Sequence, residues 1–202
     1  MIVSATSLTD SERILAVGLL TLAFENDPWL RMLSSVQRDK ISAFFDFVIQ
    51  NGIHTGQLFL KIYTEDNPYV MAGFAVVEPP KNELKNSTWR YLIFILRYFL
   101  TLDFKAFKRL NAYMRQTTKH RPKAPHHYLV CVGIAPEHQG KHLGKEVLDH
   151  LHTLSANHPL STGVGLDTEN DKNIGYYEKN GYRFTATESL EALSIYTFFR
   201  EN

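Results

Sequence analysis

Several features that would assign this chain to a large class of proteins are missing from its sequence. It has one cysteine, Cys131, so no disulfide can form within the chain, and we expect a reducing, cytoplasmic environment. Its 22 basic and 21 acidic side chains nearly cancel, which gives no electrostatic signature of a nucleic-acid or anionic-membrane partner. The most apolar stretch, residues 91–102, is too short to span a bilayer and contains Arg97. We therefore expect neither nucleic acid nor a membrane as a partner.

Neither the N-terminus nor the basic residues of the chain indicate a special function. The first seven residues contain no basic segment followed by a long apolar run, so no signal peptide is expected. Basic side chains do gather between residues 105 and 123, but a run of this kind is typical of a solvated face. The 44% of hydrophobic residues is enough for a sizeable core in 202 residues, and we expect a single domain over 1–202.

The order of helical and strand patterns predicts the fold class. A capping box at Thr9 and Glu12 begins a helix that runs to about Phe24, where the sequence 26–28 ends it. A second helix closes at Gly52, and an alternating pattern then predicts a hairpin of two strands. The expected elements after the first helix are a helix at 41–52, strands at 57–63 and 69–77, helices within 86–118, a strand at 127–134, a helix from 143, a strand at 162–167, a helix at 171–179 and strands at 182–187 and 192–199. This order predicts a three-layer α/β fold with a mixed sheet.

Residues 132–144 form the most informative stretch. A strand ends at Pro136, a polar turn with Gly140 follows, and a helix begins near Leu143. Such a turn directs several backbone N–H groups to one place, and the helix dipole adds partial positive charge there. The pattern predicts a phosphate site, although by itself it is equally consistent with a tight turn that binds nothing.

This stretch resembles the acetyl-CoA motif of GNAT acetyltransferases, Q/R-x-x-G-x-G/A. Gln139 matches its first position and Gly144 its last, while His142 replaces the middle glycine. If that position requires a positive φ, histidine costs about 1 kcal/mol relative to glycine. The resemblance implies that the pantetheine arm and pyrophosphate of acetyl-CoA are held by Val132, Gly133, Ile134, Gln139, Gly140, Lys141, His142, Leu143 and Gly144.

A second stretch, residues 170–182, resembles the later GNAT pattern N-x-x-x-x-x-x-Y-E-K-x-G-F/Y. The resemblance implies that Asn170 and Asn173 contact the cofactor and that Tyr177 protonates the leaving thiolate. It also implies a mixed, mostly antiparallel twisted sheet of about six or seven strands, with helices on both faces and a helical insertion before the acetyl-CoA-binding strand. Weaker likenesses upstream suggest a puromycin-acetyltransferase-like subgroup.

Transfer of an acetyl group to an amine also needs a group that accepts the proton of the amine. Glu78, at the end of an expected strand, is the main candidate for this base. His126 and His127 are alternatives, whereas Asp27 beside Pro28 is typical of a turn. The sequence therefore predicts a metal-free N-acetyltransferase, monomeric or homodimeric, that uses acetyl-CoA and the primary amine of a small molecule. A non-catalytic acyl-CoA sensor and a protein or peptide acetyltransferase remain alternatives.

Overall fold

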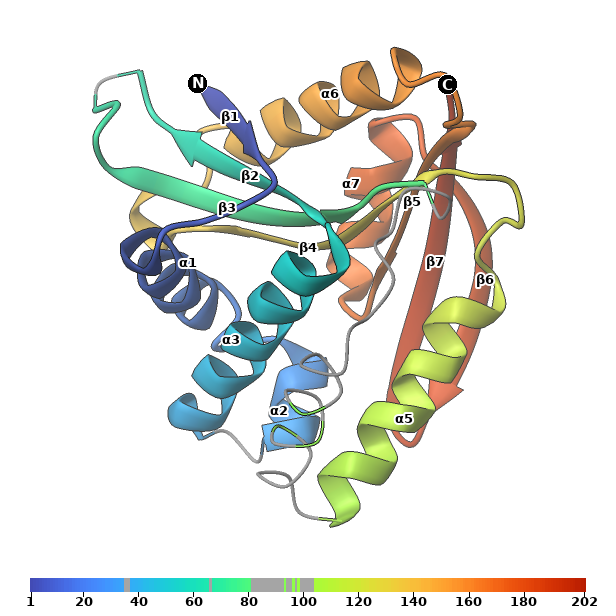
Figure 1. Ribbon diagram of the computed structural model, residues 1–202. Coiled ribbons are helices and arrows are strands. Elements are labelled where there is room, and N and C mark those ends of the chain that lie inside the picture. The colour runs from blue at the N-terminus through green and yellow to red at the C-terminus, as the bar shows by residue number, and fades with distance from the viewer. Residues whose placement is uncertain (35–36, 66, 81–92, 94–95, 97, 99–103) are drawn as a thin grey trace.

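A seven-stranded mixed sheet forms the centre of the molecule, in the order β1-β2-β3-β4-β5-β7-β6 (Figure 1). The computed structural model describes residues 1–202 except 35–36, 66, 81–92, 94–95, 97 and 99–103. All neighbouring strands are antiparallel except β4 and β5, which are parallel. The strands are β1 (Ile2–Ala5), β2 (Leu58–Tyr63), β3 (Met71–Glu78), β4 (His127–Ile134), β5 (Gly163–Thr168), β6 (Arg183–Leu190) and β7 (Leu193–Glu201). The expected sheet type and strand number are confirmed.

Helices cover both faces of this sheet, and each face has its own hydrophobic core. The first layer contains α1 (Asp10–Ala23), α2 (Pro28–Ser34), α3 (Arg38–Thr55) and α5 (Phe104–Lys119). The opposite layer contains α6 (Leu143–Ala156) and α7 (Ile174–Lys179). Figure 1 shows α6 and α7 together on one side of the twisted sheet. Within the described residues, none of these helices has the length and apolar character needed to cross a membrane.

The start of α1 follows the expected capping box. The Glu12 backbone N–H donates to Thr9 Oγ1, and the Thr9 backbone N–H donates to Glu12 Oε2 at 2.9 Å. Both groups would otherwise lack partners at a helix N-terminus. The helix ends at Ala23, one residue before the expected Phe24. Local sequence therefore determines this helix well.

Two expectations for residues 26–56 are wrong. Residues 28–34 form α2, a helix that we did not expect: Pro28 is its first residue, and Asp27 Oδ1 accepts a hydrogen bond from the Leu30 N–H at 3.0 Å. In addition, α3 does not end at Gly52 but continues to Thr55, where Gly56 adopts a left-handed φ of 80°. Gly52 has a different purpose, because a Cβ there would lie 3.0 Å from the Phe59 ring.

The edge strand β1 was also not predicted from the sequence, because it is only four residues long. It pairs antiparallel with β2. Of the expected helical insertion, the second half is confirmed as α5, whereas most of 86–103 lies outside the described residues.

Ion pairs connect α5 and the residue that follows it to β6 and the β6–β7 turn. Arg109 donates two hydrogen bonds to Glu191, and both Lys119 and His120 contact Glu188 Oε1, at 2.6 and 2.5 Å. The insertion helix is thus fixed against the far edge of the sheet.

Candidate functional site

The parallel strands β4 and β5 pair over a short distance and then separate. Their register covers only His127–Leu129 of β4 against Val164–Leu166 of β5. Beyond Leu129, β4 continues to Ile134 alongside β3, and the register shifts there because Val130 is an extra residue between two paired positions. Among the described residues, the β4 edge at 130–134 therefore has no strand partner on the β5 side. An extended ligand can form hydrogen bonds with this free edge.

The turn between β4 and α6 has the features of an anion site. Gly140 and His142 have φ of 76° and 61°, and α6 begins at Leu143. The backbone N–H groups of residues 140–144 donate to no other residue that the structure describes. Gln139 Nε2 donates to Ile134 O at 3.0 Å, which fixes the turn to the end of β4. This arrangement fits a diphosphate at the N-terminus of a 14-residue helix, next to the free edge of β4.

Gly144 lies in the first turn of α6, close to α7. A Cβ at this position would be 3.1 Å from the hydroxyl of Tyr176, which is 40% exposed. The structure thus brings Gln139, Gly144 and the end of β4 together as the sequence suggested. A larger side chain at Gly144 would enter the space that the free N–H groups face.

Tyr177 lies on the same side of the sheet as α6. Its residue is 8% exposed, and its ring packs against Phe198 and Tyr182 with centroids 5.6 and 5.8 Å apart. Burial raises the pKa of the Tyr177 hydroxyl, so this group is protonated at neutral pH. The hydroxyl therefore carries a proton that it could donate, although the raised pKa also makes it a weaker acid than an ordinary tyrosine.

The two asparagines hold the chain at the end of β5. Asn170 Oδ1 accepts from the Lys172 N–H at 3.1 Å, and Asn173 Nδ2 donates to Thr168 Oγ1 at 3.2 Å. The expected continuous helix over 171–179 is wrong, since a 3₁₀ turn at Asp171–Asn173 precedes α7. Asn170, the N-cap of this 3₁₀ turn, therefore lies outside the helix that carries Tyr177.

A half-buried acidic group lies on the other face of the sheet, at the end of β5. The hydroxyl of Tyr113, on α5, donates to Asp167 Oδ2 at 2.9 Å and contacts Glu169 Oε1 at 2.6 Å. The hydroxyl of Tyr128, on β4, donates to Asp167 Oδ1. Burial raises the pKa of Asp167, and burial together with the charge of Asp167 raises the pKa of Glu169 well above its usual range. Both carboxyls are therefore easier to protonate than ordinary exposed carboxyls.

A third carboxylate approaches this pair from the start of α2. The charge of Asp27 adds to the raised pKa of Glu169, and burial raises the pKa of Asp27 itself. The neighbouring Trp29 stacks on Tyr113, with ring centroids 4.1 Å apart. We refer to Asp27, Asp167 and Glu169 together as the acidic group. Sequence analysis treated Asp27 as a turn residue, and the structure adds this electrostatic contact.

Sequence analysis overlooked Asp167 and Glu169. A usable signal was present, because side chains two residues apart at a strand end point to one face and these two immediately precede the second motif. The three candidate bases from the sequence are each hydrogen-bonded elsewhere. Glu78 Oε2 accepts from Arg121 Nη1 at 2.6 Å, His127 Nδ1 lies 3.0 Å from Ser161 Oγ, and His126 Nδ1 lies 2.8 Å from Ala124 O. None of these three contacts places the side chain in the acidic group.

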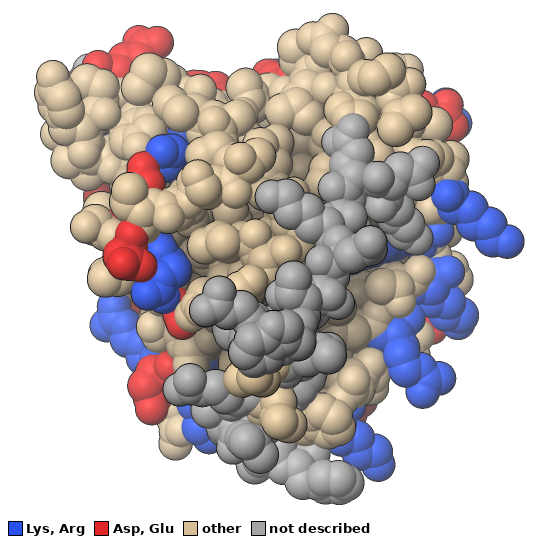
Figure 2. All heavy atoms as spheres, in the orientation of Figure 1, with Lys and Arg blue, Asp and Glu red and all other residues tan. Residues whose placement is uncertain are grey.

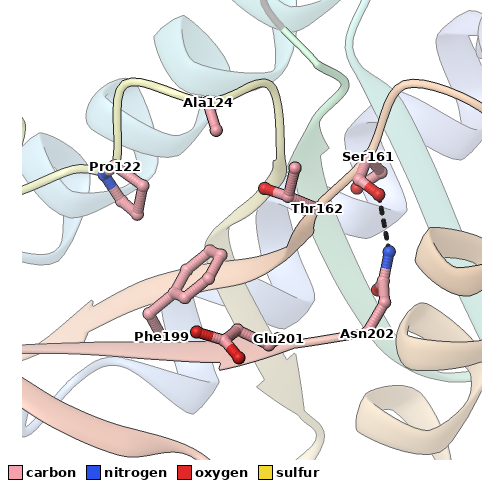
Figure 3. Close-up of a pocket in the computed structure, with 7 residues that line it drawn as sticks. All are labelled: Pro122, Ala124, Ser161, Thr162, Phe199, Glu201 and Asn202. Carbon is pink, nitrogen blue, oxygen red and sulfur yellow. Dashed lines mark hydrogen bonds between the residues drawn. The ribbon is translucent and has the colours of Figure 1, made fainter.

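Two surface features lie outside this site. Figure 2 shows Lys and Arg side chains at the right of one face, over α5; Lys105, Lys108 and Lys119 are exposed there, as expected of a solvated face. Figure 3 shows a surface hollow at the start of β4 and β5, the end opposite to the turn. Asn202 Nδ2 donates to Ser161 O at 2.6 Å within it, so these polar groups satisfy one another. The hollow is lined by Pro122, Ala124, Ser161, Thr162, Phe199, Glu201 and Asn202.

Comparisons with known proteins agree with this geometry. The sequence model of the acetyltransferase (GNAT) family matches residues 23–182. A Corynebacterium glutamicum protein named histone acetyltransferase HPA2 and related acetyltransferase has a similar structure, with a TM-score of 0.69 and 15% identity over 100% of this chain and 95% of its own. Arylalkylamine N-acetyltransferase 2 from Aedes aegypti gives a TM-score of 0.66 and 9% identity, covering 99% of this chain and 98% of its own. The NatC complex bound to Gag peptide and CoA gives a TM-score of 0.52 and 12% identity, covering 100% and 98%. At these identities the structures show a shared fold.

Proposed function

This chain belongs to the GNAT family of acetyl-CoA-dependent acetyltransferases, and on that premise we propose that its acceptor is the primary amine of a small molecule. Acetyl-CoA supplies the acetyl group as a thioester. In our proposal the turn at 139–144 holds its diphosphate, with help from Asn170 and Asn173, and the edge of β4 at 132–134 holds its pantetheine arm. The puromycin-acetyltransferase-like subgroup stays a prediction from the sequence.

The observation that supports an amine acceptor is the acidic group beside the point where β4 and β5 separate. Among the described residues, Arg121 is the cation whose charge favours ionisation of Asp167, and this cation is already paired with Glu78. Buried carboxylates of one sign are unfavourable unless a proton or a cation accompanies them. An ammonium group would supply positive charge and further hydrogen-bond donors to these carboxylates.

The proposed chemistry assigns different roles to Glu169 and Asp167. An amine with a pKa of about 10.4 is neutral in roughly one molecule in 2,500 at pH 7, a handicap of about 4.6 kcal/mol. Glu169 has a raised pKa and shares the single hydroxyl hydrogen of Tyr113 with Asp167, so we assign it as the base that removes the proton. Asp167 accepts from two tyrosines and holds the ammonium before that step. Glu78 remains a candidate base, and its ion pair with Arg121 favours Glu169 over it.

The departing thiolate needs a proton from the opposite side of the sheet. We propose that Tyr177 donates it, because its hydroxyl is buried and protonated and α7 follows directly from the end of β5. The base and the acid would then lie on different faces of the sheet, with the reacting carbon between β4 and β5. This separation would keep the two protons from exchanging directly.

A thiol-release assay tests the proposal. The purified protein is mixed with acetyl-CoA and a panel of alkylamines, an arylalkylamine, amino acids, aminoglycosides and short peptides. We expect release with at least one small amine, and a fall of roughly 10²-fold or more for Glu169→Gln, the range for a positioned base. Glu65→Gln, in the exposed β2–β3 turn, is the matched control and should retain full activity. Turnover only with peptides would contradict the small-molecule assignment, and acetyl-CoA binding without any turnover would favour a sensor.

A further inference from the structure

We propose that Arg121 is a positioning residue for the transfer reaction: held by Glu78, its guanidinium fixes the Tyr128 ring, and the Tyr128 hydroxyl in turn fixes Asp167. This inference rests on the proposed amine acceptor site. It concerns a residue outside both sequence motifs, in the loop that follows α5. It also gives Glu78 a purpose other than that of a base.

The contacts form a continuous chain across three strands. Arg121 Nη1 donates to Glu78 Oε2 at 2.6 Å, and Arg121 Cζ lies 3.4 Å from the centroid of the Tyr128 ring. This distance is typical of a stacked guanidinium, which contributes cation–π attraction as well as packing. The Tyr128 hydroxyl then donates to Asp167. Each member of the chain is thus held by the one before it.

The sheet register supports the same orientation of Tyr128. Glu78 is the β3 partner of Tyr128, and Gly165 is its β5 partner. A Cβ at Gly165 would lie 2.9 Å from Tyr128 Cδ2, so the absence of a side chain there leaves space for the ring. Asp167 lies two residues further along β5, on the same face as Gly165. The ring therefore extends across Gly165 toward Asp167, and Arg121 covers it.

The Glu78–Arg121 ion pair also joins the two ends of the segment between β3 and β4. Glu78 is the last residue of β3, and Arg121 follows α5, 43 residues later. The same α5 carries Tyr113, which donates to Asp167 from its other side. The Glu78–Arg121 pair therefore holds both ends of the segment that brings Tyr113 to the acidic group. Its side chains are 25% and 11% exposed, so water screens this pair less than a surface pair.

The positive charge of Arg121 favours the ionised form of Asp167, while burial opposes it. Loss of that charge should therefore raise the pKa of Asp167. The Asp167 carboxyl, which holds the ammonium in our proposal, would then be harder to ionise. The titratable and charged groups that contact Asp167, Tyr128 or Arg121 or act on them through their charge are Glu78 on β3, His126 before β4, Tyr113 on α5, Glu169 after β5, Asp27 before α2 and, from the opposite face of the sheet, Tyr177 on α7.

Four variants separate the parts of this chain: Arg121→Met, Arg121→Lys, Tyr128→Phe and Glu78→Gln. The first measurement is the pH profile of kcat/KM for an accepted amine. For Arg121→Met we expect the acidic limb to move to higher pH by about one unit, the lower end of the shift that a neighbouring arginine produces. Arg121→Lys keeps the charge and should recover most of that shift. Glu78→Gln removes a negative charge, so its acidic limb should not move to higher pH.

The second measurement does not depend on turnover. The pKa of Asp167 is followed by carboxyl ¹³C NMR in wild type and in Arg121→Met, with Asp167→Asn to assign the signal. We expect the pKa to rise in Arg121→Met, and also in Tyr128→Phe, which removes only the hydroxyl. Circular dichroism confirms that each variant is folded.

Two results would overturn the inference. The first is an unchanged Asp167 titration in folded Arg121→Met. The second is loss of turnover at all pH values in Glu78→Gln while Arg121→Met stays at least tenfold more active, since that pattern would make Glu78 the base. If wild type transfers acetyl to no amine, the proposed function fails, and the NMR titration still decides the role of Arg121.

Discussion

His142→Gly isolates the conformational cost of the turn that precedes α6. His142 is the N-cap of this helix with φ 61° and ψ 6°, and its exposed side chain makes no capping hydrogen bond. Apart from Glu191, no other described non-glycine residue has a positive φ. The substitution therefore removes backbone strain without removing a packed contact.

The expected gain follows from the left-handed conformation. A residue with a Cβ is disfavoured there by about 1 kcal/mol relative to glycine. We therefore expect the free energy of unfolding to increase by about 1 kcal/mol, equivalent to a rise of roughly 2–4 °C in Tm for a chain of this size. The affinity for acetyl-CoA should change little, because the backbone N–H groups that we propose hold the diphosphate remain.

Denaturant unfolding and calorimetry measure the gain, and Gly140→Ala is the matched control. Gly140 has φ 76°, and no atom lies within 4 Å of a Cβ built there, so the added methyl group tests conformation alone. We expect this control to lose about 1 kcal/mol. The reasoning is refuted if His142→Gly is no more stable than wild type while Gly140→Ala is destabilised. A loss of acetyl-CoA affinity above tenfold in His142→Gly would show instead that the imidazole contacts the cofactor.

Three further predictions concern the cofactor, the acid and the base. Gly144→Asp places a negative side chain where the free N–H groups point, so we expect folded protein with acetyl-CoA binding weakened beyond detection by calorimetry; unchanged affinity would exclude this turn as the diphosphate site. Tyr177→Phe keeps the ring packing and should lower kcat by roughly 10²-fold at nearly constant acetyl-CoA affinity, and normal turnover would remove Tyr177 from the reaction. The folded protein raises the pKa of Glu169, so ionisation of this group lowers stability as pH rises from the ordinary carboxyl range through the folded pKa. Glu169→Gln, which still accepts from Tyr113, should therefore raise Tm more at pH 8 than at pH 4.5, and an equal change at both values would contradict the raised pKa.

Features that depend on neighbouring residues could be predicted from the sequence. The capping box at Thr9 and Glu12 needs only two side chains three residues apart, and the structure shows both of its hydrogen bonds. The turn at 139–144 and the start of α6 are equally local, because glycine and the helix N-terminus determine where the N–H groups point. Even the positive φ at His142 could be anticipated from the motif.

Features that depend on distant residues required the tertiary structure. Tyr113 reaches Asp167 across 54 residues, and Arg121 reaches Glu78 across 43, so no local pattern relates the members of either pair. The expected end of the second helix failed for a similar reason. Gly52 looked like a helix terminus, yet a glycine is needed there because a side chain would collide with the ring of Phe59 on β2.

The acidic group is the clearest case of this division. Each of its carboxylates, taken alone in the sequence, is an ordinary polar residue at a turn or a strand end. Only the pairing of β4 with β5 and the packing of α2 and α5 bring Asp27, Asp167 and Glu169 together and shield them partly from water. Sequence alone therefore determined the geometry of the turn that we propose binds the diphosphate, because backbone N–H groups and glycine act over a few residues. Tertiary structure decided which carboxylates have raised pKa values, because burial and charge–charge repulsion act between side chains that only the fold makes neighbours.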